Sequence, residues 1–166
     1  MLDLLIQYYM ATYEITSFRK PFTHELNSVI IHNRVNQYGR CRIGSEIFGS
    51  ATSSRYIKSL FVLAQFVNHD GSVDFYPGQI QYFFTHTVSL ANGPVNHKLA
   101  YIRWYKSVNS ANIQFYFSID KTEACNVELW DPEFYPIKRE CFIPVHNIFS
   151  RFVLVLYKIS KRQNSH

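Results

Sequence analysis

The chain has 166 residues, of which 47% are apolar and 17% aromatic, and its formal net charge is +5. This length suits one domain and leaves no room for two independent ones. The three cysteines, Cys41, Cys125 and Cys141, form no close pair in sequence, which predicts reduced thiols in an intracellular protein. The positive charge favours an acidic partner, because net charge influences which molecules a protein encounters.

The first predicted element is an amphipathic helix near Leu2 to Ile15. Its apolar residues recur at helical spacing: Leu2, Leu5, Ile6, Tyr9 and Tyr13. Asp3 interrupts this apolar stretch, which is also too short for a membrane span, so we expect no contact with a membrane. The helix starts without a capping residue, which leads to the hypothesis that the chain is the tail of a longer reading frame.

A basic extended segment follows the helix and completes an N-terminal region at residues 1–54. Pro21 breaks any helix there, and Val29 to Ile31 form a short predicted strand. Further along, alternation separates two pairs of side chains, with Arg40 and Arg42 on one face and Cys41 and Ile43 on the other. Glycines at positions 39, 44 and 49 predict bends or bulges in this extended path.

Residues 55–157 are predicted to form a small antiparallel SH3-like barrel, and residues 158–166 a basic tail. The fold class is therefore mainly β with an N-terminal helix. Turns are expected at Asp70-Gly71, at Pro77-Gly78 and at residues 91–94, so the strands between them form a four-stranded meander. Further strands are expected at residues 113–119, 127–130 and 141–145, and Pro144 restricts the last one to an edge or a bulge.

The predicted central strand, residues 99–105, has two distinct faces. One carries Leu99, Tyr101, Arg103 and Tyr105, and the other carries Ala100, Ile102 and Trp104. The second face is the better candidate for the core, because it lacks charge.

Residues capable of catalysis or metal binding form no recognisable pattern. Cys125, Cys141 and His146 lack the paired, short spacing of structural zinc ligands, so buried thiols are the favoured interpretation. Cys41 or Cys141 with His146 also lacks a nucleophile motif. We therefore expect neither an enzyme nor a cofactor.

A nuclease assembles acidic residues around a metal ion, so four acids of the chain are candidates for such a site. They are Asp70, Asp74, Asp120 and Glu128. The alternation of strands and helices that a nuclease core requires is absent from the predicted elements. Acids solvated at turns and strand ends are the favoured interpretation.

The candidate binding residues combine positive charge with aromatic rings. Arg40 and Arg42, extended by Arg55 and Lys58, are expected to attract phosphate, because guanidinium groups on a strand face need solvent or an anion. The alternative is a solvated basic surface without a partner. A second contact face is expected at Tyr101, Arg103 and Tyr105, although core packing of these rings is the favoured alternative.

The order of several blocks carries a resemblance to a known group of proteins. The blocks run from Gly78 to Phe84, from Leu99 to Tyr105, from Val127 to Tyr135 and from Ile143 to Ile148, with Tyr38 to Ser50 upstream. This order resembles the C-terminal barrel-like segment of multicopy, transposon-associated reading frames of fungi, over residues 2–152.

More distantly, the barrel is similar to a bromo-adjacent homology domain. Trp104-Tyr105, Glu128 to Trp130 and Cys141 to Val145 stand where that family has its aromatic pair, its Leu-Phe-like block and its late strand. The resemblance implies a chromatin or protein-interaction module.

Taken together, these features predict a non-catalytic nucleic-acid or chromatin-binding module derived from a transposon-encoded protein and located in the nucleus. Two alternatives stay open. In one, the barrel docks a peptide or a neighbouring transposase domain, and in the other the chain is an inactive fragment.

Overall fold

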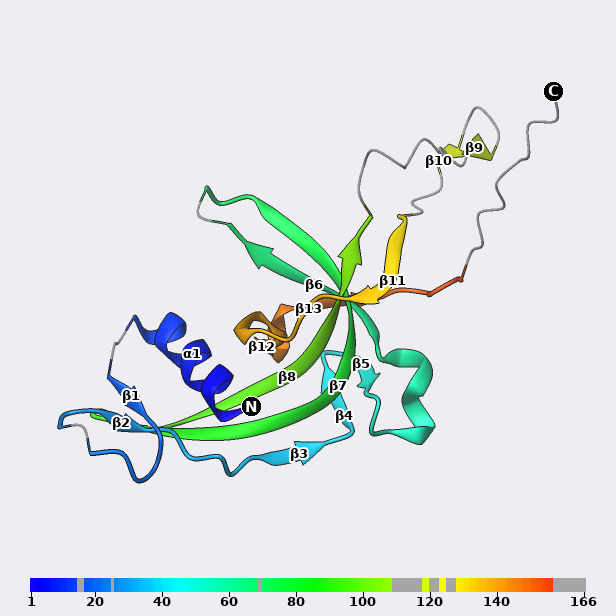
Figure 1. Cartoon of the computed structure of the whole chain (residues 1–166). Helices are drawn as coiled ribbons and strands as arrows, with labels where there is room; N and C mark the ends of the chain where they lie inside the picture. Colours follow the sequence, from blue (N-terminus) through cyan, green and yellow to red (C-terminus); the bar gives the residue numbers. More distant parts are fainter. Residues whose placement is uncertain are drawn as a thin grey trace.

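The computed structural model describes residues 1–14, 17–24, 26–68, 70–108 and 128–156, and the backbone of two short strands at 118–119 and 123–124. Antiparallel strands dominate this part of the chain, and one α-helix precedes them (Figure 1). The predicted mainly-β class with an N-terminal helix is confirmed.

The predicted amphipathic helix is α1, Leu2–Tyr13. It buries Leu5, Ile6 and Tyr9, which belong to the predicted apolar stripe. The helix ends where Glu14 adopts a left-handed conformation with φ of 53°, a common way to stop a helix.

Short strands fill the region between α1 and the main sheet. Strands β1 (Phe18–Arg19) and β2 (Val29–Ile30) pair in parallel, and β3 (Asn36–Tyr38) pairs with the later strand β7. Strands β4 (Arg40–Ile43) and β5 (Glu46–Gly49) then form a hairpin. Its turn contains Gly44 with φ of 60°, a conformation that favours glycine. The 3₁₀ helix η1, Ser54–Ser59, follows.

A three-stranded antiparallel meander forms the centre of the molecule, from β6 (Phe61–Val67) through β7 (Val73–Leu90) to β8 (Gly93–Ser107). The predicted turn at Asp70-Gly71 joins β6 to β7, and the predicted turn at residues 91–94 joins β7 to β8. The carboxylate of Asp70 accepts hydrogen bonds from the backbone N–H and the hydroxyl of Ser72, at 2.9 and 2.6 Å.

The turn predicted at Pro77-Gly78 is wrong, because both residues lie inside β7. Pro77 faces Leu63 of β6, whereas pairing with β8 starts one residue later at Gly78. Proline is tolerated there because its missing N–H costs no ladder hydrogen bond. A Cβ at Gly78 would overlap Ile102 and the Trp104 ring, so the glycine is needed to let these two side chains pack against the β7 backbone. The meander has three strands for this reason, and not the predicted four.

The C-terminal part contributes five short strands to the described chain. They are β9 (Ser118–Ile119), β10 (Glu123–Ala124), β11 (Trp130–Phe134), β12 (Phe142–Pro144) and β13 (Ile148–Arg151), with the 3₁₀ helices η3 (Arg139–Cys141) and η4 (Val145–Asn147) on either side of β12. Strands β11 and β12 pair with β8, β13 pairs with β6, and β9 and β10 pair with each other in a separate sheet. Strand β11 begins at the last residue of the strand predicted over 127–130. Residues 113–117 of another predicted strand lie outside the described residues.

The predicted barrel is not closed. The strand path runs β11-β8-β7-β6-β13, and among the described residues its two end strands do not pair with each other. Pro132 removes a donor from β11, and the register shifts in both β11 and β13. Aromatic side chains lie between the two ends of the strand path. The centre of the Phe152 ring lies 5.9 Å from that of Phe61 and 6.3 Å from that of Tyr105.

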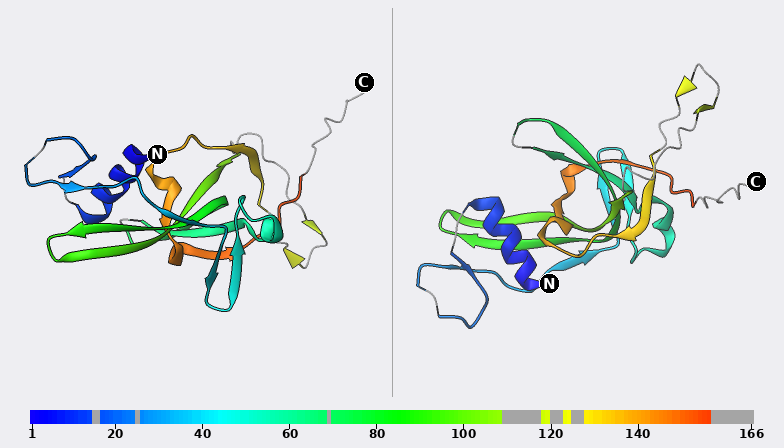
Figure 2. Two further views of the ribbon diagram at one scale, coloured as in Figure 1. Left: turned by 90° about the horizontal axis from the view of Figure 1, so that it is seen from below. Right: turned by 45° about the horizontal axis from the view of Figure 1, so that its top comes forward.

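The long β7–β8 hairpin connects two different environments (Figures 1 and 2). At its free end, the hairpin lies beside α1, β1 and β2. At its base, it meets β6, and the β4–β5 hairpin projects nearby from the sheet, as the left view of Figure 2 shows. The candidate site lies at the base.

Candidate nucleic-acid interface

The β4–β5 hairpin is held against η1 by hydrogen bonds and close packing. The backbone N–H of Gly49 donates to the Ser59 hydroxyl at 2.9 Å, and this hydroxyl donates to the Tyr56 carbonyl at 2.9 Å. A Cβ at Gly49 would overlap the backbone of Tyr56. The loop between the two elements is fixed as well, since the Ser50 hydroxyl donates to the Gly39 carbonyl at 2.8 Å. Strand β4 and η1 are therefore parts of one rigid unit.

This unit carries the four basic residues that the sequence predicts as phosphate-binding groups. Arg40 and Arg42 lie on the exposed face of β4, and Arg55 and Lys58 are exposed on η1. The Arg40 guanidinium lies 5.6 Å from the centre of the Tyr56 ring and its Nη1 donates to the Tyr56 hydroxyl at 3.4 Å. We call Arg40, Arg42, Arg55 and Lys58 the basic corner.

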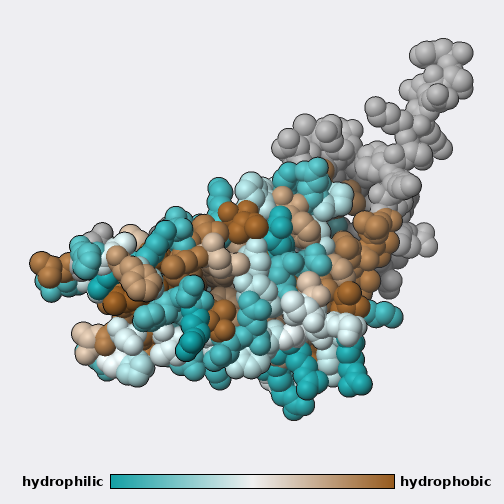
Figure 3. All heavy atoms as spheres, turned by 60° about the horizontal axis from the view of Figure 1, so that its bottom comes forward, coloured by the Kyte–Doolittle hydropathy of each residue, from teal (hydrophilic) through white to brown (hydrophobic). Residues whose placement is uncertain are grey.

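The charges of the basic corner are not neutralised by an acid in the part of the chain that the structure describes. None of its four residues forms an ion pair with any described residue. The acid of the β4–β5 hairpin, Glu46, pairs instead with Arg151 of β13 at 3.2 Å. Figure 3 and the left view of Figure 2 both bring the underside of the molecule in Figure 1 toward the reader. The lower edge of the molecule in Figure 3 is hydrophilic.

Two residues near the basic corner were not among the sequence candidates. Tyr56 positions Arg40, and its place next to Arg55 in the chain is the signal that sequence reasoning had available. Lys98 of β8 lies close enough to Cys41 that its charge lowers the pKa of the thiol, although burial has the larger effect and raises that pKa. Lys98 is brought close to β4 by the strand register of the β7–β8 hairpin, which the local sequence does not reveal.

The structure contradicts the second predicted contact face at Tyr101 and Tyr105 and agrees with the favoured alternative, core packing of these rings. Tyr101 is 8% exposed and Tyr105 is 5% exposed, so both rings belong to the core. Phe142 of β12 covers Tyr101 at 5.6 Å, and Phe134 of β11 covers Tyr105 at 4.7 Å. The face predicted as core, with Ala100, Ile102 and Trp104, is buried too. Residues 99–105 of β8 are therefore covered on both faces.

Arg103 differs from its two neighbours on that face. Its side chain is half-buried, and its guanidinium lies 5.0 Å from the centre of the Phe134 ring. Its Nε is buried and has no hydrogen-bond partner among the described residues. It is separated from the basic corner by its place beside β11, so we do not include it in the site.

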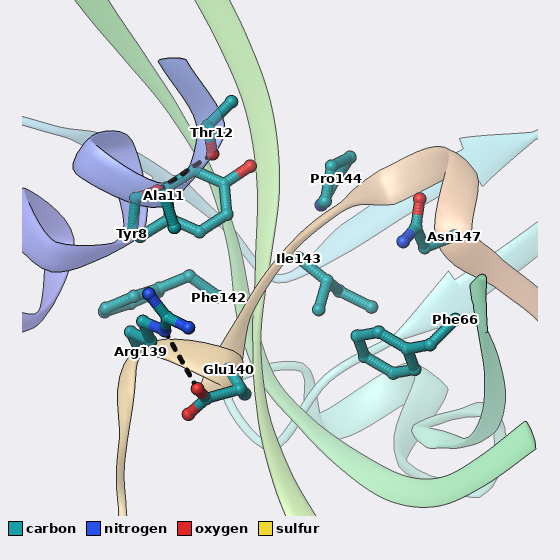
Figure 4. A pocket seen from close by; sticks show the side chains of 10 residues that line it. All are labelled: Tyr8, Ala11, Thr12, Phe66, Arg139, Glu140, Phe142, Ile143, Pro144 and Asn147. Carbon is teal, nitrogen blue, oxygen red and sulfur yellow. Dashed lines mark hydrogen bonds and ion pairs between the residues drawn. The ribbon is translucent and has the colours of Figure 1, made fainter. Parts of the chain in front are cut away.

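A pocket of about 300 Å³ lies between α1 and the segment from η3 to η4 (Figure 4). Phe66, Phe142 and Ile143 provide apolar walls. The charged residues that line it, Arg139 and Glu140, pair with each other at 2.9 Å. The pocket therefore offers neither an unpaired charge nor a nucleophile with an adjacent base.

The groups considered for metal binding and catalysis are dispersed or only partly described. Cys125 and Asp120 lie outside the described residues, Cys141 is a buried free thiol whose pKa is raised by burial, and His146 is exposed on η4. Asp70 and Asp74 both make hydrogen bonds in the β6–β7 turn. Among the described residues, no three His, Cys, Asp or Glu gather in a way that fits a metal ion.

Neither membrane spans nor relatives add a further assignment. No helix in the described part of the chain has both the length and the apolar character that crossing a bilayer requires. No known protein family, curated protein or solved structure matches this chain. The resemblance to fungal transposon-associated reading frames and to the bromo-adjacent homology domain therefore stays a prediction.

Proposed function

We propose that this protein is a non-catalytic module that binds nucleic acid through the basic corner. The observation that carries the proposal is the exposure of four cations on one rigid unit without an ion pair in the described chain. A chromatin setting, a nuclear location and a transposon-encoded origin are parts of the same proposal that rest on the sequence resemblance alone.

The physical argument concerns the cost of holding like charges together. Cations that share one small unit repel each other, and a polyanion relieves this repulsion while its own counterions are released. Arg40 is also partly positioned before binding, because its guanidinium lies over the Tyr56 ring. An arginine held in this way loses less conformational entropy when it contacts a phosphate.

The test is the binding of a fluorescent 20-base-pair DNA duplex by the full chain, measured by anisotropy across a salt series. The double variant Arg40→Ala/Arg42→Ala should weaken binding roughly tenfold and reduce the slope of log K against log salt by about 2. The expected loss is similar for unrelated duplex sequences, because contacts to phosphate do not depend on the base.

The matched control is Lys138→Ala/Arg139→Ala, which removes the same charge at the start of η3, where Arg139 lines the pocket described above. This control should leave the salt slope within about 0.5 of the wild-type value. Equal effects of the two double variants would assign binding to net charge and contradict a local site. Absence of DNA binding at low salt would contradict the proposed function.

One observation favours protein docking as a second candidate function. Val67, Val73, Phe75 and Phe149 are exposed apolar residues on the β6–β7 hairpin and β13. The rings of Phe75 and Phe149 contact each other at 4.9 Å. Exposed apolar clusters of this kind often mark protein interfaces. Binding to a partner that is insensitive to salt and lost in Phe149→Ser would support this candidate.

A further inference from the structure

Four aromatic and imidazole side chains link α1 to the free end of the β7–β8 hairpin. His86 of β7 and His97 of β8 are cross-strand partners. Tyr9 and Tyr13 lie one turn apart on α1, so they face the same surface. We call Tyr9, Tyr13, His86 and His97 the tyrosine–histidine network.

Burial favours a neutral His86, and the hydrogen bonds of the network fit that state. Its Nε2 lies 2.8 Å from the His32 carbonyl oxygen, which can only accept, so Nε2 carries the hydrogen. In the neutral imidazole, Nδ1 is then the acceptor for the Tyr9 hydroxyl at 2.8 Å. The Tyr13 hydroxyl forms a second bond, at 2.7 Å, with Nε2 of His97.

The surroundings of the two imidazoles oppose a positive charge. His86 is 2% exposed and is faced by Tyr9 of α1, His97 of β8 and His32 of the segment after β2. His97 is faced by Tyr9, Tyr13 and His86. Within the described residues, neither imidazole pairs with a carboxylate. Burial lowers the pKa of both histidines, and the neighbouring His86 lowers that of His97 further.

We propose that the tyrosine–histidine network is a pH-sensitive latch, in which protonation of His86 and His97 releases α1 from the β7–β8 hairpin while the meander stays folded. Protonation would place a charge in the buried contact between helix and sheet and would turn Nδ1 of His86 from an acceptor into a donor, so the Tyr9 hydroxyl would have to turn to accept. The backbone pairing of the meander does not involve α1, because β6, β7 and β8 pair with one another and with β3, β11, β12 and β13.

The direction of the pH effect follows from linkage. A histidine released into solvent has a pKa near its ordinary value of about 6.5, above that of the docked state, so the released state binds more protons as the pH falls. Docking is therefore fully stable above this value and weakens below it. Between pH 7.5 and 5.5, the opening equilibrium should rise about tenfold if one histidine titrates and about a hundredfold if both do.

Hydrogen exchange of the full chain, measured by mass spectrometry at pH 7.5 and 5.5 and corrected for intrinsic exchange rates, tests the latch. Protection of residues 2–13 should fall about tenfold to a hundredfold at the lower pH. Protection of residues 78–84, inside the meander, should stay within about twofold. Unchanged protection of α1, or an equal loss in both segments, would overturn the proposal.

Two variants separate the latch from general acid sensitivity. His97→Gln and His86→Gln replace an imidazole with a side chain that does not titrate, and each should reduce a hundredfold pH effect on α1, which requires both histidines, by about tenfold. If His86→Gln, the substitution at the more buried position, fails to fold, His97→Gln alone tests the latch. The matched control is His146→Gln, which removes an exposed histidine on η4 and should leave the pH effect unchanged. A control effect as large as that of His97→Gln would also overturn the latch.

Discussion

The two ends of the β7–β8 hairpin handle ionisable side chains in opposite ways. At the free end, Tyr9 and His86 are buried and neutral, and each polar atom of their contact has a hydrogen-bond partner. At the base, Arg40 and Arg42 are exposed and charged and have no ion-pair partner in the described chain. Both arrangements avoid an unpaired charge in the interior, which is the costly alternative.

This difference separates a structural contact from a candidate binding surface. Hydrogen bonds inside a buried contact contribute to stability because breaking them leaves polar atoms unsatisfied. Exposed cations contribute little to stability, since water already solvates them, and they are available to an external anion. Substitutions at the free end should therefore change stability, and substitutions of charge at the base should change binding.

Gly49→Ala should have the largest effect, because it disrupts the base without removing a charge. The new Cβ would overlap the backbone of Tyr56, and backbone cannot rotate away as a side chain can. We expect the free energy of unfolding to fall by about 3 kcal/mol, measured by urea denaturation and circular dichroism. DNA binding should weaken too, since η1 would move away from β4.

The control for this substitution is Gly39→Ala in the same unit. The nearest atom to a Cβ at Gly39 is the Ser53 Cβ at 3.2 Å, a tight contact that a small shift relieves. Its cost should stay below about 1 kcal/mol. Equal stabilities of the two variants would show that β5 and η1 are not packed as described.

Tyr9→Phe should have an intermediate effect, confined to the free end. It keeps the ring but removes the hydroxyl that donates to His86, so a buried acceptor loses its partner. The expected loss is about 1–3 kcal/mol in the free energy of unfolding at pH 7.5. Tyr13→Phe, which acts on a less buried bond, should cost less than about 1 kcal/mol. A larger loss from Tyr13→Phe, or weaker DNA binding by Tyr9→Phe, would contradict the separation of the two ends.

Features encoded by local periodicity were predictable from the sequence. The apolar stripe of α1, the alternation around Arg40 and the Asp70-Gly71 turn depend on neighbouring residues alone, and the structure contains all three. The basic corner was predictable as a set of residues for the same reason. Its rigid attachment through Gly49 and Tyr56 was not, because it depends on a contact between separate elements.

The errors concern residues whose environment comes from distant parts of the chain. Pro77-Gly78 has turn chemistry, but packing against Trp104 overrides it. Tyr101 and Tyr105 alternate with the core residues as an exposed face would, yet β12 and β11 cover them. The role of His86 was not predictable from local pattern, since its partner Tyr9 lies 77 residues away in sequence.

Glu46→Gln should have the smallest effect and is the sharpest test of the base. Glu46 holds Arg151 in an exposed ion pair, and both side chains are about half exposed, at 47% and 48%. Its removal should change the free energy of unfolding by less than about 0.5 kcal/mol. Arg151 would then add a free cation beside the basic corner, and DNA binding measured by anisotropy should tighten about two- to threefold.

Glu133→Gln is the matched control, because it breaks a similar exposed ion pair, with Lys106 of β8, and changes the net charge by the same amount. That pair lies at β11, away from β4 and η1, so DNA binding should stay within about 1.5-fold of the wild-type value. If both variants tightened binding equally, net charge would account for it. A gain restricted to Glu46→Gln would instead place the DNA backbone within about one Debye length of Arg151, which requires the duplex to lie along the side of the β4–β5 hairpin that faces β13.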